Sequence, residues 1–301
     1  MKKQFTKRNA LAEIAQHVIE AMETTGTDWL TPWATVTGAH GLPENAKGRQ
    51  YTGLNRLYLG MMAASNGFTS NTFGTYKQWQ SLGAHVRKGA TGLPVVFYKA
   101  LDITERDPAT GQESTKQIPM LKHFIVFNAS QVEGWDGQHL EDDADAVQTW
   151  NDHLDAEQVI RNTGATINHA KQNRAFYSPS SDVIVMPERH QFVDAGAYYG
   201  TMLHELTHWT GAKHRLNRDF SGRFGNEAYA FEELIAELGA AMLCVKTGVT
   251  STPREDHAKY LNNWVSVIKK DNKAILKAAS AAEKAAQFIL DHKASEEEAA
   301  A

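Results

Sequence analysis

The sequence predicts an α+β protein of two domains, and three observations support this fold class. The chain of 301 residues is long enough for two cores of ordinary size, and its hydrophobic content of 42% and charged content of 22% are typical of globular proteins. The first half mixes helical periodicity with extended apolar runs, whereas the second half is mainly helical with short extended pieces. A polar, acidic stretch without a core-forming pattern separates the two. We expect domains over residues 1–136 and 147–294, a linker over 137–146, and a frayed tail over 295–301.

The first domain is expected to combine helices with antiparallel strands. The segments with apolar residues at helical spacing are residues 9–24, 55–64 and 73–82. Asn9 can cap the first of these helices, and Asn71-Thr72 can cap the third. The extended runs over residues 92–98 and 123–128 predict a hairpin whose polar tip is residues 105–117.

The second domain is expected to be mainly helical, with a small sheet near its start. The extended pieces are residues 165–169, 175–178 and 182–186. The helices are expected over residues 146–162, from 195 through the histidine-rich segment, over 229–245, and twice between 253 and 291. The small sheet therefore precedes the central helices along the chain.

Composition excludes several classes of protein. There is no run of about eighteen apolar residues, so the sequence predicts no transmembrane span and no membrane partner. The basic residues 1–8 run into an amphipathic segment and not into the apolar core of a secretory signal. The single cysteine, Cys244, excludes an intrachain disulfide and a cysteine-rich zinc finger. We expect a cytoplasmic protein.

Charge is distributed unevenly along the chain. Residues 1–136 hold 14 Lys and Arg against 11 Asp and Glu, which gives +3, and the remainder holds 17 against 24, which gives −7. A positive first half suggests an anionic partner for that half. Because an excess of +3 is small, the alternative is chance variation in the distribution of charged residues. Charge alone does not distinguish this alternative from an anionic partner.

Residues 204–208 carry the strongest chemical signal. His204 and His208 are four residues apart, so on a helix both imidazoles leave the same face one turn apart. Two neutral imidazoles placed in this way suit a tetrahedral Zn²⁺, or another divalent metal, with positions left for a third ligand and a water. Glu205 lies about 100° further round the helix and can serve as a general base toward that water. The alternative is a half-buried helix with two incidental histidines.

A third ligand should come from a helix packed against this one. Glu233 and Glu237 are four residues apart on an alanine-rich segment, whose small side chains permit close approach of the two helices. Carboxylates buried on such a helix need a cation or hydrogen-bond donors. We take Glu233 as the ligand. Glu237 would orient one of the two histidines, or serve as the alternative ligand.

The arrangement of these two helices resembles the Glu-zincin metallopeptidases. The resemblance implies that the three short strands form a small sheet beside a cleft, with an edge strand that can pair with an extended peptide. Hydrolysis of a peptide would require a further donor to stabilise the oxyanion. The residues that could supply it, which the sequence does not rank, are Tyr199, Tyr229, His214 and Tyr260.

The first half interleaves basic and aromatic residues with glycine-rich turns. This mixture suits single-stranded nucleic acid, because bases stack on rings and phosphates meet cations. The alternative is that the aromatic residues face a core and the lysines are simply solvated. The candidate DNA-binding residues are Arg49, Tyr51, Asn55, Arg56, Tyr76, Lys77, Trp79, Arg87 and Lys88.

Several motifs of the first half together resemble the N-terminal domain of the ArdC antirestriction family, which also occurs at the front of some plasmid primases. The motifs lie at residues 32–33, 41–45, 48–55, 75–78, 82–89 and 127–134. The second half, through residues 229–241, resembles the metallopeptidase-like domain that follows in that family. The similarity covers nearly the whole chain in the family's order.

The resemblance implies a plasmid-borne protein that binds single-stranded DNA and protects incoming DNA from host restriction during conjugation. Its second domain would hold a divalent metal in a zincin fold. Whether that domain also cleaves a protein, such as a restriction component, does not follow from the motif. Two alternatives stay open. One is a metalloprotease whose first domain recognises a protein substrate, and the other is a binding protein whose metal is purely structural.

Overall fold

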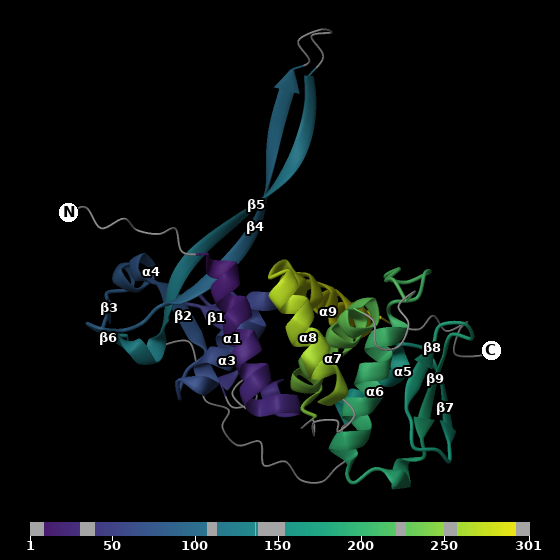
Figure 1. Cartoon of the computed structure of the whole chain (residues 1–301). Coiled ribbons are helices and arrows are strands. Elements are labelled where there is room, and N and C mark those ends of the chain that lie inside the picture. Colours follow the sequence, from purple (N-terminus) through teal and green to yellow (C-terminus); the bar gives the residue numbers. More distant parts are fainter. Residues whose placement is uncertain are drawn as a thin grey trace.

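The structure is a computed structural model that describes residues 9–30, 40–106, 113–135, 137, 154–220, 227–249 and 258–292. An N-terminal half with a long projecting hairpin lies beside a mainly helical C-terminal half (Figure 1). The predicted α+β class, with mixed helices and antiparallel strands first and helices with a small sheet second, is confirmed.

A mixed sheet in the order β1-β2-β5-β4 organises the N-terminal half. Its strands are β1 (Glu44–Asn45), β2 (Thr72–Thr75), β4 (Leu93–Arg106) and β5 (Glu113–Asn128), and a separate pair is formed by β3 (His85–Val86) and β6 (Val132–Glu133). β4 and β5 pair antiparallel from Leu93 opposite Val126 to Arg106 opposite Glu113. The predicted hairpin therefore exists, but its strands run much further into the expected polar tip. Residues 107–112 lie outside the described residues.

The helices described in this half are α1 (Ala10–Thr25), α3 (Gly53–Ser65) and α4 (Tyr76–Ser81), with short 3₁₀ turns η1 (Gly26–Leu30) and η2 (Ala129–Gln131). Asn9 caps α1 as predicted, since its side chain accepts a hydrogen bond from the Ala12 backbone N–H at 3.2 Å. The expected helix over 73–82 is wrong in its first part. Phe73 is fully buried in β2 between two neighbouring strands, and Thr75, not Asn71-Thr72, caps the short α4.

The C-terminal half follows the predicted order of elements. Its first helix is α5 (Leu154–Asn162), and its sheet, in the order β7-β9-β8, contains β7 (Thr166–Ala170), β8 (Phe176–Ser178) and β9 (Val183–Pro187). The turn η3 (Arg189–Gln191) leads to α6 (Ala195–Trp209), α7 (Glu227–Thr247), α8 (Ala258–Lys270) and α9 (Lys273–Asp291). β8 is an edge strand and packs beside α6. Among the described segments no helix is long and apolar enough to cross a membrane.

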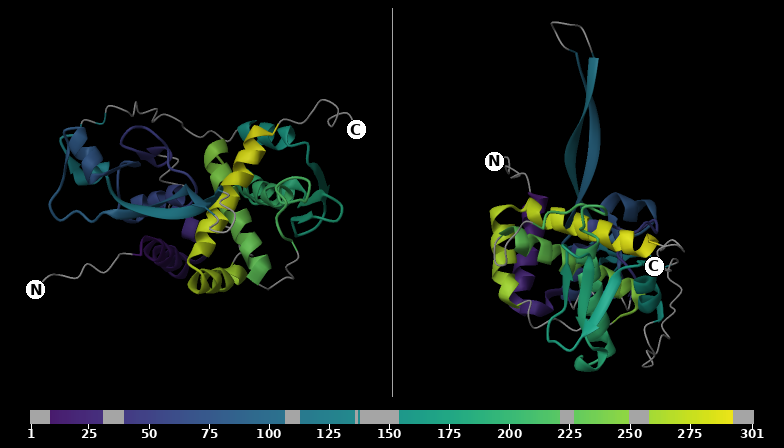
Figure 2. Two further views of the ribbon diagram at one scale, coloured as in Figure 1. Left: turned by 90° about the horizontal axis from the view of Figure 1, so that it is seen from above. Right: turned by 90° about the vertical axis from the view of Figure 1, so that its right-hand side faces the viewer.

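One hydrophobic cluster runs through both halves, and α9 lies where they meet. The cluster includes Ile14 and Tyr58 from the first half and Leu203 and Ile275 from the second. α9 packs against α3 on one side and against α6 and α7 on the other (Figure 2). Glu283 of α9 accepts a hydrogen bond from the first backbone N–H of α3 and pairs with Arg56 at 2.9 Å. The expected linker, apart from Gly137, lies outside the described residues.

Candidate metal centre

Helix α6 positions the two histidines and the glutamate between them. Its N-terminus is capped by Asp194, whose side chain accepts a hydrogen bond from the Ala197 backbone N–H at 2.7 Å. His204, Glu205 and His208 are all buried, and the two imidazole rings lie 4.9 Å apart, edge to face. Four-residue spacing on a helix thus places both rings together, as the sequence predicts.

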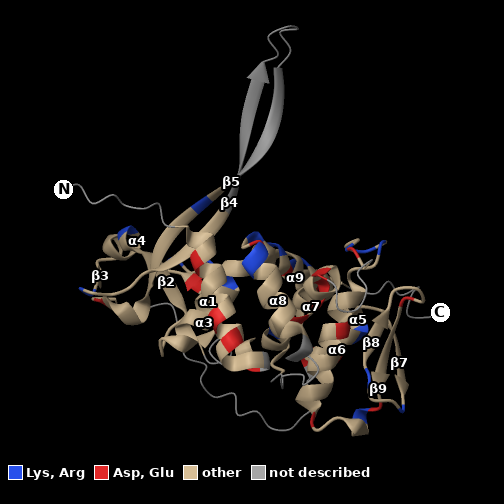
Figure 3. Cartoon of the chain, viewed as in Figure 1, with Lys and Arg blue, Asp and Glu red and all other residues tan. Residues whose placement is uncertain are grey.

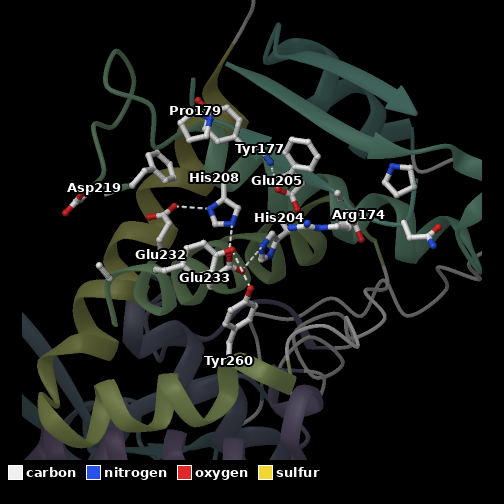
Figure 4. A pocket seen from close by; sticks show the side chains of 18 of the residues that line it. Arg174, Tyr177, Pro179, His204, Glu205, His208, Asp219, Glu232, Glu233 and Tyr260 are labelled. Carbon is white, nitrogen blue, oxygen red and sulfur yellow. Dashed lines mark hydrogen bonds and ion pairs between the residues drawn. The ribbon is translucent and has the colours of Figure 1, made fainter. Parts of the chain in front are cut away.

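Helix α7 brings Glu233 to these rings (Figure 4). Its carboxylate oxygens lie 3.6 Å from His204 Nε2 and 3.7 Å from His208 Nε2. The close approach of the two helices depends on Gly239, because a Cβ there would meet Thr207 Cγ2 of α6 at 2.5 Å. Glycine therefore allows α7 to pack directly on the helix that carries the histidines.

Two further carboxylates of α7 lie at the opposite nitrogens of the rings. Glu237 lies 3.5 Å from His204 Nδ1, in the orienting position that the sequence suggested. His208 Nδ1 donates to Glu232 at 3.1 Å. A carboxylate at Nδ1 fixes the tautomer that presents the lone pair of Nε2 to a metal. His208 is therefore prepared as an Nε2 ligand, and Glu237 lies where it would favour the same tautomer of His204.

Arg218 holds the Glu232 carboxylate in place. The Arg218 guanidinium donates to both oxygens of Glu232, at 2.8 and 3.0 Å, and also to the carbonyl of Thr207 at 2.6 Å. Burial opposes ionisation of Glu232, but the hydrogen bonds from His208 and Arg218 outweigh it and keep the pKa of this carboxyl below its usual range. Arg218 thus ties the segment after α6 to the carboxylate that orients His208.

The Glu233 carboxylate is also held in its charged form. Burial raises its pKa, but the interactions with the neighbouring His204, His208 and Tyr229 side chains outweigh burial, so the pKa lies below its usual range. Tyr229 contributes a further hydrogen bond to Glu233, and the Tyr260 hydroxyl lies 3.4 Å from that of Tyr229. Two phenols therefore line the side of the centre where Glu233 sits.

Glu205 is fixed by the edge strand of the small sheet. The backbone N–H of Tyr177 in β8 donates to Glu205 Oε2 at 2.9 Å. Glu205 lines the same cavity as the two histidines and Glu233, and this cavity has a volume of about 710 Å³. Its walls include Phe176 of β8, so the edge strand and the carboxylate face one space. This is the arrangement that the peptidase resemblance implies.

The residues present fit a divalent metal. One nitrogen of each histidine and one oxygen of Glu233 lie within 4.8 Å of one another, and all three side chains are buried. A tetrahedral Zn²⁺ with bonds of about 2.0–2.1 Å separates its ligands by about 3.4 Å, close to the separations of 3.6 and 3.7 Å found here. Glu237 lies at His204 Nδ1, so Glu233 is the carboxylate placed to act as ligand.

The structure separates the four candidate oxyanion donors. Tyr229 and Tyr260 line the cavity of the metal centre. Tyr199 instead donates its hydroxyl hydrogen to Glu157 at 2.7 Å, and His214 is mostly exposed beside Asp182. Of these four residues, only the first pair lies where a substrate in this cavity could be reached.

Four of the candidate DNA-binding side chains serve the interior of the N-terminal half. Trp79 is fully buried and donates to the Phe127 carbonyl at 3.0 Å, and Asn55 is buried and exchanges two hydrogen bonds with the backbone of Val96. Arg56 is directed to Glu283 and to the carbonyl of Tyr51. Burial of the Tyr51 hydroxyl raises its pKa to about 12. These side chains are not available to stack on bases or to meet phosphates.

The other five candidates are exposed. They are Arg49, Tyr76, Lys77, Arg87 and Lys88, located at the turn after β1, on α4 and after β3. Figure 3 shows positive residues at α4 and near β3, at the end of the molecule away from the metal centre. A surface of exposed cations with the Tyr76 ring is thus present in the N-terminal half.

Several residues that contribute to the candidate sites in the structure are not predicted from the sequence. Glu232 is not among the candidate site residues predicted from the sequence, although its place on the alanine-rich helix carries the same signal as that of Glu233. Arg218 stands in a segment without periodicity, so nothing in the pattern pointed to it. Phe97 and Phe124 are exposed aromatic residues on neighbouring strands, in edge contact at 5.6 Å. Their strands were predicted, but which face stays open depends on tertiary packing.

Comparison with known proteins identifies a family for each half. Residues 8–127 match the N-terminal domain of the anti-restriction factor ArdC, and residues 154–281 match a zincin-like metallopeptidase domain. The protein y4eC of Sinorhizobium fredii is 37% identical over 94% of this chain and 92% of its own length. DNA primase TraC of Escherichia coli is 35% identical over 92% of this chain, which spans 27% of that primase.

Solved structures give the same assignment. The crystal structure of the antirestriction protein ArdC from plasmid R388 in its metal-free form has a TM-score of 0.77 and 36% identity, and the alignment covers 94% of this chain and 97% of that one. Its Mn(II)-bound form has a TM-score of 0.75 and 34% identity, with the same coverage. The chain therefore belongs to the ArdC family of antirestriction proteins, with an N-terminal ArdC domain and a zincin-like metallopeptidase domain whose His204, His208 and Glu233 could hold a divalent metal.

Proposed function

We propose that this protein binds single-stranded DNA and protects incoming plasmid DNA from host restriction during conjugation. The observation that carries the DNA-binding part is the surface formed by the exposed candidates Arg49, Tyr76, Lys77, Arg87 and Lys88. Cations that meet phosphates and rings that stack on bases are the recurring elements of single-strand binding. The likeness to ArdC and to primase TraC supports the same partner.

We further propose that the C-terminal half is a zinc-dependent peptidase centre acting on a protein such as a restriction component. His204, His208 and Glu233 would hold the ion, and Zn²⁺ bound there would supply Lewis acidity. Glu205 would accept a proton from the attacking water and return it to the leaving amine. Tyr229 and Tyr260 would donate to the developing negative charge.

The position of Glu205 favours catalysis over a purely structural metal. A structural centre needs only ligands, whereas this centre also holds a buried carboxylate against the edge strand of an open cavity. The same edge strand, β8, would present backbone groups to an extended peptide. The substrate would therefore be bound in extended form along β8.

Two substitutions separate these hypotheses in a test of plasmid transfer into a restricting host. Glu205→Gln keeps an oxygen acceptor for the Tyr177 N–H and leaves all three ligands intact, so it should abolish protection only if hydrolysis is required. His204→Ala should remove the metal under every hypothesis. Full protection by a correctly folded Glu205→Gln variant would refute the peptidase proposal and leave a structural metal.

The DNA-binding part is tested on the whole chain with a labelled single-stranded oligonucleotide. Affinity should fall steeply as salt is raised, because each neutralised phosphate releases counterions. Joint replacement of Lys77, Arg87 and Lys88 by glutamine should weaken binding. Absence of salt-sensitive binding by the unmodified protein would contradict the proposal.

A further inference from the structure

A second groove lies on the C-terminal half, apart from the metal centre. It has a volume of about 570 Å³ and runs between α9 and the segment after α6. The residues that line it are Leu216, Arg218, Lys273, Leu276, Lys277, Ser280, Ala281 and Lys284. None of these eight residues lines the cavity of the metal centre. Apolar side chains thus form part of a groove whose rim is strongly basic.

The three lysines share one face of α9. Lys273, Lys277 and Lys284 are exposed, and the opposite face of the helix is buried alanine and isoleucine. With a rise of 1.5 Å per residue, they span about 16 Å along the helix. Their row of positive charge is therefore long enough to follow several successive phosphates of a flexible strand.

The charge pattern of this face is costly for an ordinary solvated helix. Lys273 and Lys277 stand four residues apart, where like charges destabilise a helix. The acidic neighbour at this end is Asp271, which pairs with Lys277 at 3.3 Å, and Glu283 is turned away toward Arg56 of α3. A surface helix commonly offsets such repulsion with carboxylates one turn away. Asp271 offsets part of this repulsion, and the remaining positive charge of the face is complementary to an anionic ligand.

The groove is connected to exposed rings at the base of the hairpin. Phe124 and Phe97 contact each other at 5.6 Å, and Phe97 contacts Tyr51 at 6.4 Å. Tyr51 is two residues before Gly53, whose backbone N–H donates to Glu283 of α9. Lys284 is the next residue of that helix. Figure 2 shows α9 crossing the body directly below the hairpin, and Figure 3 shows positive residues gathered where α8 and α9 meet. The contacts through Tyr51, Gly53 and Glu283 thus place the rings of the hairpin base near Lys284.

We propose that this groove binds the phosphodiester backbone of single-stranded DNA whose bases stack on Phe97 and Phe124. The strand would pass from the hairpin base across Lys284 to Lys277 and Lys273, so the metallopeptidase-like half contributes part of the DNA site. Lys122, exposed on the same face of the hairpin as Phe97 and Phe124, adds a cation at the start of this path. The inference rests on the proposed single-strand binding and extends it to the second half.

The experiment compares two double variants of the full chain. Lys277→Gln/Lys284→Gln removes two charges from the groove, and Lys171→Gln/Lys246→Gln removes two exposed charges that line neither cavity. Each protein is titrated with a labelled single-stranded oligonucleotide over a range of salt concentrations. Because all four lysines are exposed, thermal unfolding should confirm that both variants fold like the parent.

Loss of two phosphate contacts should reduce the slope of log affinity against log salt by about 1.4, at about 0.7 for each contact on a single strand. The control variant should keep the slope of the parent. Equal slopes for the two variants, with strong binding by the parent, would overturn the groove proposal but not the proposed single-strand binding. If the parent itself binds no single-stranded DNA, the proposed function fails and the groove proposal fails with it.

Discussion

The candidate metal centre and the proposed DNA-binding surfaces place charged groups in opposite ways. At the metal centre, His204, His208 and Glu233 are buried, and each has a defined partner behind it. On the two proposed DNA-binding surfaces, side chains such as Lys77 of α4 and Lys284 of α9 are exposed to solvent. Buried charges are fixed before any ligand arrives, and removing one leaves its partner uncompensated. Exposed charges act by summed attraction, so each removal should cost little and depend on salt.

The largest effect should follow removal of a buried ligand. His208→Ala should abolish one-to-one zinc binding measured by calorimetry, and it leaves Glu232 and Glu233 without their shared neighbour. The apoprotein should also lose about 1–3 kcal/mol of stability, because Glu232 loses one of its hydrogen-bond donors in a buried site. His190→Ala, at an exposed histidine, is the control. Stoichiometric zinc in the His208→Ala protein would show that the ion binds elsewhere.

A smaller effect on metal affinity should follow Glu232→Gln. The new amide would still approach His208 but would no longer hold its Nδ1 proton as a carboxylate does, nor balance Arg218. Partners behind a metal ligand typically change affinity by about 10–100-fold, and competition with a chelating dye measures this. The matched control is Glu227→Gln at the exposed start of the same helix. Affinity equal to that of the control would mean that Glu232 does not position His208.

The packing of α7 on α6 gives a third comparison. Gly239→Ala should destabilise the protein by roughly 1–3 kcal/mol, as overpacking does in a tight interior, because the new methyl would meet Thr207. Thr207→Ser removes the Cγ2 atom of that clash and keeps the hydroxyl that donates to Leu203. The double variant should therefore recover part of the loss in thermal unfolding. Simple additivity of the two changes would argue against this contact.

The smallest effect is expected at a half-exposed pair. The hydrogen bond from Arg215, opposed by partial burial, holds the pKa of Asp182 below its usual range. A lowered folded-state pKa gives stability that is complete above the ordinary aspartate pKa and is lost as pH falls through the folded value. Asp182→Asn should cost roughly 0.2–1 kcal/mol near neutral pH, the range for exposed pairs. Asparagine tolerates the φ of 55° at this position.

Denaturant titrations at several pH values test this assignment. The stability difference between the parent and the Asp182→Asn variant should shrink as the pH drops below about 4, the ordinary range of aspartate. A difference that stays constant down to acid pH would assign the effect to packing and not to charge.

The sequence predicted the grouping of His204, His208 and Glu233 better than the exposure of the candidate DNA-binding residues, and the reason is the range of the contacts involved. His204 and His208 are brought together by one turn of helix, which spacing alone reveals. Glu233 required only that a second helix pack against the first. The environment of Trp79 or Asn55, in contrast, depends on strands far along the chain, Phe127 and Val96 respectively. Residue type alone does not distinguish a ring that stacks on a base from one that fills a core.

The same dependence on distant contacts explains why the helix expected over 73–82 is wrong in its first part. Its apolar spacing is compatible with a helix, but pairing of Phe73 between β1 and β5 takes the first residues into the sheet. The hairpin strands also extend beyond their apolar runs, because pairing with the partner strand continues where the hydrophobic pattern ends. In both cases tertiary pairing overrides local preference.

The position of α9 has a consequence for how such proteins are inherited. A helix that contacts α3 on one side and the histidine-facing α7 on the other cannot be separated from either without uncovering apolar surface. Recombination that joined only one half to a new partner would therefore yield a poorly soluble product. In agreement with this, the match to primase TraC takes in 92% of this chain as one block. In that relative, regions similar to both halves occur together.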